Sequence, residues 1–398
     1  MNSTTPLSRE ARSTLSKLAL VHFLRLTGIF FLIPLIVIYA KTLTSNYFLA
    51  GLALGSYEIA MAAMQLPSTY LYRKVGKKNY IYFGLSLFII GNVICFLTGD
   101  IYVLILGRFI EGMGAISSPI TALSIDAVPE DRRTTAMAFT GMGIGFAFLG
   151  GLGFSSIIGN YIGIRNFFLI SAVLGVLAIL VIKGVHERFN ENEVVEHHKG
   201  QGRKSITILT SSFSLAMVTF LFFFILQRTY YIDLGFLYYG IIIFVAVLIS
   251  GIIAVILSEV VNRKKPFNIF RLSLLIVFSG TVIFFGVLFL KPIAVLALLS
   301  IVPFITGFTI YEIAAIPTLF SSSSIEGKEN VLGVYFTLQY AGNGIGSVIA
   351  GLIALYFIKF TMLEIFFVLA VILSFVSLIS YSFTTKVDIN NKGKHSSL

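Results

Sequence analysis

Five ionisable side chains interrupt otherwise apolar stretches of this sequence: Arg25, Glu58, Arg108, Glu111 and Glu312. A charged side chain costs about 2.5–3.5 kcal/mol at the centre of a membrane-spanning helix, so a position that faces lipid is unfavourable. We therefore expect these side chains to face a water-filled cavity or one another. Ionisable residues in such places commonly carry protons, ions or charged solutes across a membrane.

Glu58 is the first candidate for proton binding. Counting ~1.5 Å per residue from the start of its apolar segment places Glu58 near the middle of a membrane, and Glu111 lies at a similar depth. A carboxyl in a partly dry cavity takes up a proton more readily than one in water, so changes of access can load and unload it. The alternative is a permanent ion pair of Glu58 with Arg25 or Arg108 that only joins helices.

Arg108 and Glu111 are spaced i,i+3, which puts them on one face of a helix. They form either a structural salt bridge or part of the proton-coupling site, in which Arg108 lowers the proton affinity of Glu58 or Glu111. The guanidinium of Arg108 is also suited to bind an anionic solute. For Glu312 we expect a position toward the cytoplasm and a role in gating or packing.

Uncharged polar side chains within the apolar segments, together with Arg25, are the candidate substrate contacts. Each also has a structural interpretation, because buried amides and hydroxyls commonly join helices by hydrogen bonds. The candidates are Tyr57, Gln65, Asn92, Gln227, Gln339 and Asn343.

All these residues lie in twelve long apolar segments, and about 20 residues suffice for a helix to cross a hydrocarbon core of about 30 Å. With 57% hydrophobic and 12% charged residues and a mean hydropathy of +0.93, the chain has too little polar surface for a soluble domain. Helices are expected because backbone exposed to lipid must satisfy its own hydrogen bonds. The sequence thus predicts an all-α polytopic membrane protein. The predicted spans are 17–40, 47–71, 79–98, 101–127, 134–158, 165–185, 206–228, 235–259, 267–290, 292–320, 330–357 and 361–384.

Most of the 29 lysine and arginine residues fall on one side of these spans, which predicts cytoplasmic N- and C-termini by the positive-inside rule. The longest polar stretch, 186–204, divides the spans six and six and is expected to be a cytoplasmic linker. The segments 1–185 and 205–398 are then two six-helix bundles, an arrangement typical of secondary transporters that rock about a central site.

Composition also excludes several function classes. The net charge of +11 is explained by basic loops beside anionic lipid headgroups, and no nucleic-acid partner is expected. The single cysteine, Cys95, permits no disulfide or cysteine-rich metal site, and the five histidines form no cluster with Asp or Cys. We therefore expect neither an enzyme nor a metal site, and no cofactor beyond a proton gradient.

Four motifs in the first half resemble those of the major facilitator superfamily. The segment 72–78 is similar to the loop motif GxxxDRxGRR, although Thr69 and Arg73 stand where the family has Gly and Asp. The fourth span is similar to LxxxRxxQGxGA, with Glu111 at the glutamine. The fifth is similar to GxxxGPxxGG, with glycines at 141, 145, 150 and 151 and Phe146 at the proline. The sixth opens on 165–168, which is similar to WRxxF.

Three further segments, 25–30, 65–67 and 133–139, resemble the drug:proton antiporter-like branch of that superfamily. The resemblance implies proton-coupled efflux of amphipathic, drug-like small molecules by a monomeric, multi-pass protein of the cell membrane, whose partners are the substrate, protons and lipids. The alternative is a proton symporter or uniporter for a small metabolite or organic anion. Phe146 in place of the antiporter proline counts against export.

The resemblance also implies a cytoplasmic gate. In the family, the loop-motif Asp lies beside the positive N-terminal end of the eleventh span, a position that repels Arg73. Arg73 either pairs with Glu326 or Glu329 when the gate is closed or binds lipid phosphate. The remaining residues that we assign to gating are Gly76 in the loop motif, the pair Lys77 and Asp126, and Gly145 and Gly150 on the sliding surface of the fifth span.

Overall fold

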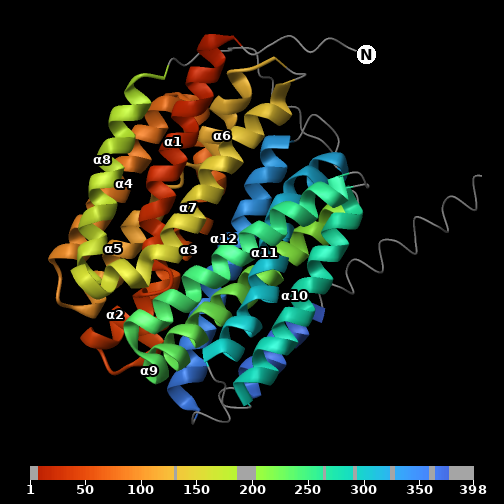
Figure 1. Cartoon of the computed structure of the whole chain (residues 1–398). Helices are drawn as coiled ribbons and strands as arrows, with labels where there is room; N and C mark the ends of the chain where they lie inside the picture. The colour runs from red at the N-terminus through yellow and green to blue at the C-terminus, as the bar shows by residue number, and fades with distance from the viewer. Residues whose placement is uncertain are drawn as a thin grey trace, which may run out of the picture.

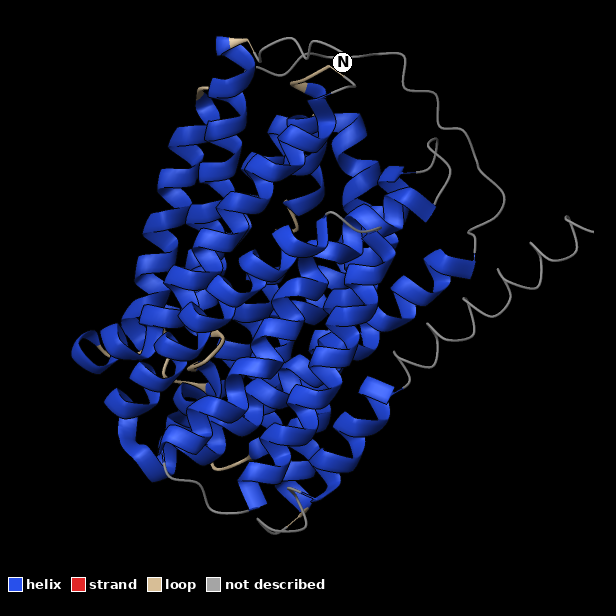
Figure 2. Ribbon diagram, turned by 45° about the vertical axis from the view of Figure 1, so that its right-hand side comes forward, coloured by secondary structure: helices blue, strands red, loops and turns tan. Residues whose placement is uncertain are grey.

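The computed structural model describes residues 8–129, 132–185, 203–262, 266–289, 294–322, 328–357 and 364–375, and the regular elements in these ranges are all helices (Figure 2). The last range ends on a short apolar helix, Glu364–Phe375. The labelled helices are α1 (Arg9–Leu32), α2 (Ile36–Leu43), α3 (Tyr47–Val75), α4 (Lys77–Leu97), α5 (Ile101–Met113), α6 (Ser117–Asp126), α7 (Arg133–Ile162), α8 (Arg165–Lys183), α9 (Arg203–Asn262), α10 (Pro266–Phe289), α11 (Ala294–Ser322) and α12 (Lys328–Tyr356).

Nine helical segments in the described residues are long and apolar enough to cross a membrane. At about 1.5 Å per residue, even the 19 residues of α8 extend for nearly the thickness of a hydrocarbon core. The prediction of an all-α polytopic membrane protein is therefore confirmed.

Two of the predicted spans are broken. Residues 17–40 form α1 and α2, which are separated at 33–35, where Pro34 has no N–H with which to continue the helical ladder. Residues 101–127 form α5 and α6, which are separated at 114–116. There the carbonyl of Gly114 accepts a hydrogen bond from the Arg25 guanidinium at 3.1 Å, so a side chain takes up a backbone group that the break releases.

Helix α9 holds two predicted spans, and its long helical run reverses direction. The Tyr311 hydroxyl donates to the Ile208 carbonyl at 3.3 Å, and the Ser250 hydroxyl donates to the Val302 carbonyl at 3.1 Å. Residues 208 and 250 would lie about 63 Å apart on a straight helix, whereas their partners on α11 lie about 13 Å apart. The first part of α9, which contains Ile206–Gln227, and the second part, which contains Leu237–Ile253, therefore run side by side along α11.

Helices α1 to α8 gather on one side of the molecule and α9 to α12 on the other (Figure 1). The two groups meet where α3 packs along α12 and α7 packs along the second part of α9. We call the end at which α1 begins and α3 ends at Val75 the upper end, as in Figure 1, and the end with α2 and the reversal of α9 the lower end.

Small residues join the two groups near the lower end. A Cβ atom added to Gly51 would lie 2.6 Å from the Ser347 carbonyl oxygen, and one added to Gly55 would lie 2.8 Å from the carbonyl oxygen of Gly344. Without hydrophobic force between helices in lipid, such close approach supplies the packing energy that holds them together.

The close packing of α3 on α5 yields a stability prediction. A Cβ on Gly112 would lie 2.2 Å from the Tyr57 carbonyl oxygen, so Gly112→Ala must push α5 away from α3. Overpacking of this kind costs about 1–3 kcal/mol, and we expect a lower midpoint of thermal unfolding in detergent. Cys95 is buried, so its labelling by a thiol-reactive dye reports unfolding. A Cβ on Gly141 would meet no atom within 4 Å, and Gly141→Ala is the control; equal midpoints for both variants would contradict the prediction.

Candidate functional site

Arg25 lies at the centre of the first helical group, fully buried, with its guanidinium directed at α3 and at the break after α5. Its Nη2 atom donates to the Tyr57 hydroxyl at 3.0 Å and contacts the Met61 sulfur at 3.4 Å, in addition to its bond with Gly114. The Nε and Nη1 atoms have no hydrogen-bond partner among the described residues, and no carboxylate there forms an ion pair with Arg25. Arg25 is thus a buried cation that forms no ion pair with a described residue.

Arg108 and Glu111 on α5 form a buried ion pair between Nη1 and Oε2, as their i,i+3 spacing predicts. The Arg108 guanidinium also lies 4.7 Å from the centre of the Tyr57 ring, within the range of a cation–π contact. Tyr57 therefore contacts both arginines, one through its hydroxyl and the other through its ring face. This arrangement connects α1, α3 and α5.

Glu58 follows Tyr57 on α3 and is 4% exposed, but it forms an ion pair with neither arginine. Its Oε2 atom accepts a hydrogen bond from the Asn343 amide of α12 at 3.0 Å. The carboxyl is therefore held across the contact between the two helical groups by an uncharged partner. The polar centre of the first group is directly connected to the second group through this bond.

The remaining predicted polar residues lie in three settings. Gln339, one turn before Asn343 on α12, donates from its amide to the Glu312 carboxyl on α11 at 2.6 Å. The Gln65 amide donates to the Ser118 hydroxyl and joins α3 to α6. The Asn92 amide is buried on α4 and donates to the Phe88 carbonyl at 2.8 Å, within its own helix. Their assignment to substrate binding stays a prediction.

Gln227 lies at the lower end, at the break between α1 and α2. Its Oε1 atom accepts from the Val37 N–H at 2.9 Å, and its Nε2 atom donates to the Ile33 carbonyl at 2.9 Å. The Tyr239 hydroxyl donates to the carbonyl of Pro34 at 3.2 Å. Side chains of α9 thus satisfy the backbone groups that Pro34 leaves open, and we call these three contacts the lower latch.

At the upper end, Gly76 joins α3 to α4 with a φ of 91°, a conformation that residues with a Cβ rarely adopt. This turn places Lys77 where its Nζ atom lies 2.6 Å from the Asp126 carboxylate, so the predicted pair is present. Arg73 is described, whereas Glu326 and the side chain of Glu329 lie outside the described residues. Pairing of Arg73 with either glutamate stays a hypothesis.

The glycines of α7 contribute unequally to packing. A Cβ on Gly143 would lie 2.3 Å from the Ala19 carbonyl oxygen, and one on Gly151 would lie 2.4 Å from Cβ of Phe30, so these two make the close contacts with α1. A Cβ on Gly145 or Gly150 would meet no atom within 4 Å. In this conformation Gly145 and Gly150 do not form a contact surface, and their role in sliding stays a prediction.

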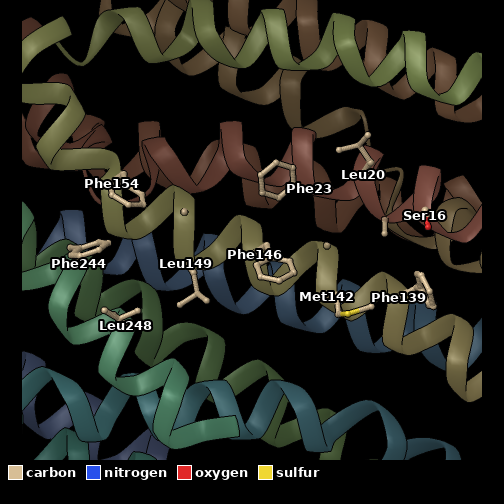
Figure 3. A pocket seen from close by; sticks show the side chains of 13 residues that line it. Ser16, Leu20, Phe23, Phe139, Met142, Phe146, Leu149, Phe154, Phe244 and Leu248 are labelled. Atoms are coloured by element: carbon tan, nitrogen blue, oxygen red, sulfur yellow. The ribbon is translucent and has the colours of Figure 1, made fainter.

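An apolar groove of about 760 Å³ runs between α1, α7 and the second part of α9 (Figure 3). Phe154 and Phe244 pack against each other at one end, with ring centroids 4.8 Å apart, and Ser16 is the polar residue at the other end. Phe146, which stands where the antiporter motif has proline, is 63% exposed and lines the middle of the groove.

The family model for the Major Facilitator Superfamily matches residues 18–343. The chain belongs to this superfamily. The inner membrane transport protein YajR of Escherichia coli K12 is 28% identical over 350 residues, covering 84% of this chain and 76% of YajR. An uncharacterized transporter of Buchnera aphidicola subsp. Baizongia pistaciae is 28% identical over 381 residues, covering 91% of this chain and 95% of the relative.

Among solved structures, a bacterial homolog of the human lysosomal transporter Spinster, in an inward-facing and occupied conformation, has a TM-score of 0.77. It is 15% identical, and the match covers 95% of this chain and 98% of that structure. At that identity the likeness shows the superfamily fold. This chain is therefore a secondary transporter of the cell membrane and not an enzyme.

Sequence reasoning missed the lower latch. Pro34 signals that the ladder breaks, and Gln227 signals a polar group within a span, but nothing in the sequence connects two positions so far apart. Sequence reasoning also predicted no partner for Glu312. Gln339, which bonds it, was predicted only as a substrate contact. Amide residues one turn apart on a single span, as Gln339 and Asn343 are, could have indicated a shared face.

The lower latch yields a prediction about conformation. Gln227→Leu leaves buried backbone groups at Ile33 and Val37 without partners, which costs about 1–3 kcal/mol in the closed state alone. With spin labels at exposed positions 161 and 356 in a cysteine-free background, we expect a larger population of long distances between the ends of α7 and α12.

Tyr239→Phe removes one bond and should produce a smaller shift in the same direction. Its neighbour Tyr238 is 66% exposed, so Tyr238→Phe is the matched control. A distance distribution for Gln227→Leu identical to that of the unsubstituted protein would show that the latch does not hold the lower end closed.

Proposed function

We propose that this protein exports amphipathic, drug-like molecules in exchange for protons, by alternating access through twelve spans with both termini in the cytoplasm. The basic residues of the loops at the upper end support this orientation, which makes the lower end the outer face. The helical groups 1–185 and 205–398 act as the two moving bundles, connected by the linker 186–204. Substrate, protons and lipid are the partners, and the transporting unit is a monomer.

The observation that carries this proposal is the contact of Glu58 with Asn343. A buried carboxyl that forms no ion pair is stable in a dry contact when it is protonated, and its ionised form requires water or the nearby positive charges of Arg25 and Arg108. Because the contact joins the two bundles, the charge of Glu58 acts directly on the equilibrium between their arrangements.

The charges around Glu58 favour exchange. Arg25 and Arg108 contribute two positive charges, and Glu111 contributes one negative charge, so the cluster is neutral when Glu58 is ionised. A proton on Glu58 and a cationic substrate beside ionised Glu58 each bring the cluster to the same charge of plus one. The cluster therefore binds either a proton or a cationic substrate, but not both at once. Such mutually exclusive binding is the requirement for antiport.

The apolar groove supports a drug-like substrate. Its aromatic and aliphatic lining offers hydrophobic contact and few hydrogen-bond partners, which suits molecules that partition into membranes. The lower latch and the glycine contacts of α3 join the two groups at the outer end, which supports access of substrate from the inner side in this conformation. Arg73 with Glu326 or Glu329 then closes the cytoplasmic end in the opposite state, beside the pair of Lys77 and Asp126, which is already present here within the first helical group.

The decisive experiment uses proteoliposomes with ethidium as the probe and an imposed pH gradient. We expect transport of ethidium against the proton flow, and Glu58→Gln should reduce gradient-driven flux at least about tenfold, which corresponds to about 1.4 kcal/mol, because the variant cannot release a proton. Glu10→Gln, at an exposed position on α1, is the matched control and should transport normally. Gradient-driven ethidium flux that is unchanged in Glu58→Gln would remove Glu58 from coupling.

One observation favours a second function, cotransport of an organic anion with a proton. Arg25 is a buried cation that forms no ion pair among the described residues, and a proton on Glu58 together with an anion at Arg25 leaves the cluster neutral. The guanidinium is covered by Tyr57 and Met61 here, so an anion reaches it only when α3 moves away from α1.

The anion function predicts a different result in the same vesicles. Labelled salicylate should be taken up with the proton flow, Arg25→Gln should abolish the saturable part of that uptake, and Arg25→Lys should retain part of it because it keeps the charge. Salicylate uptake that is equal in empty vesicles and in vesicles with the protein would exclude this function and leave cation exchange.

A further inference from the structure

Glu312 is a second carboxyl within the membrane-spanning part of the protein, in the opposite helical group from Glu58. It lies on α11, is half-buried, and accepts the amide hydrogen bond from Gln339 already described. No cation forms an ion pair with it among the described residues. The alternating-access cycle proposed above gives this carboxyl no role.

Glu312 and Glu58 are held in the same way. Each accepts a hydrogen bond from a primary amide on α12, and the two amides, Gln339 and Asn343, are spaced i,i+4 on that helix. Residues at this spacing are neighbours on one helix surface. One surface of α12 therefore bonds a carboxyl of its own helical group and a carboxyl of the opposite group.

A primary amide is a distinctive partner for a carboxyl. Its NH₂ group donates to an ionised carboxylate, and after a rotation its carbonyl accepts from a protonated one, so it can bond both states. Lysine or arginine would instead stabilise only the ionised form. An amide is therefore the uncharged partner that suits a carboxyl whose proton comes and goes.

Among the described residues, the surroundings of Glu312 supply no fixed charge that pairs with it. Tyr311 precedes it on α11, and Tyr335 and Tyr340 face it from α12. The first part of α9 has no ionisable residue from 206 to 227. On α10, Arg271 is exposed and forms no ion pair with Glu312.

We propose that Glu312 is a second proton-binding site, coupled to Glu58 through the paired amides of α12. This deepens the proton-exchange function, on which its place in the transport cycle rests. When α12 moves against α3, the Glu58–Asn343 bond changes, and the turn that carries Asn343 also carries Gln339. Proton binding at either carboxyl therefore biases the same helix, and two protons are exchanged in each cycle.

Infrared titration of the purified protein tests the second site without any transport substrate. The C=O stretching band of a protonated carboxyl is followed as the pH is raised. We expect two bands that disappear on titration, one absent in Glu58→Gln and the other absent in Glu312→Gln. Gln339→Lys should remove the Glu312 band by keeping that carboxyl ionised, and Gln339→Leu should shift its frequency while the Glu58 band stays in place.

Two outcomes would overturn the proposal. One is identical spectra for the unsubstituted protein and Glu312→Gln at every pH, which would show a carboxylate that never binds a proton. The other is a Glu312 band that persists at every pH, which would show a permanently protonated packing residue. If Glu312→Gln fails to fold, as judged by dye labelling of Cys95, Gln339→Leu decides, because it retains the carboxyl and an unchanged spectrum would contradict the proposal.

A measurement of the number of protons exchanged per ethidium tests the role of Glu312 separately from the efflux function. In ethidium-loaded proteoliposomes, Glu312→Gln should lower the number of protons exchanged per ethidium by one, measured from the pH gradient that balances a known membrane potential. Glu10→Gln should leave the ratio unchanged. An unchanged ratio in Glu312→Gln, with normal flux, would overturn coupling through Glu312. Absence of ethidium flux in the unsubstituted protein would contradict the efflux function and leave the infrared assignment standing.

Discussion

The lack of hydrogen-bonding solvent in a hydrocarbon layer is the constraint on which the rest of this structure depends. Each polar atom there must find its partner within the protein. Arg25 meets part of that need through Nη2, which bonds a tyrosine hydroxyl and the carbonyl of Gly114, and Arg108 does so with Glu111 and the face of Tyr57. Because these partners lie on different helices, satisfying the charges also fixes how α1, α3 and α5 pack.

The same constraint explains which features could be predicted from the sequence. Hydropathy reports length and apolar content, so the helical class and the absence of Arg25 and Glu58 from the lipid-facing surface followed directly. It does not report which partner completes a broken ladder, because that depends on contacts between distant segments. The single spans expected at 17–40 and 101–127 are therefore broken in the structure, at Pro34 and after Gly114, where Gln227 and Arg25 compensate.

The i,i+3 spacing correctly joined Arg108 to Glu111, since that pairing is local. The partners of Glu58 and Glu312 were beyond sequence reasoning, because amides on α12 can bond many groups and only the packing of α12 on α3 and α11 selects among them. The resemblance to the superfamily predicted the general architecture. At Thr69, Arg73 and Phe146 the residue differs from the superfamily motif, so the resemblance could not predict the contacts made at these positions. Phe146 lines the groove, so its substitution for proline changes a surface as well as a helix.

The lower latch has a consequence for how this protein can evolve. Gln227 and Tyr239 recognise main-chain atoms at Ile33, Pro34 and Val37, and main-chain atoms are the same whatever side chains those positions carry. The closure therefore constrains Ile33 and Val37 through the packing of their buried side chains and not through these hydrogen bonds. The requirement for a particular side chain falls instead on positions 227 and 239, in the other half of the chain, where the side chain itself makes the contact.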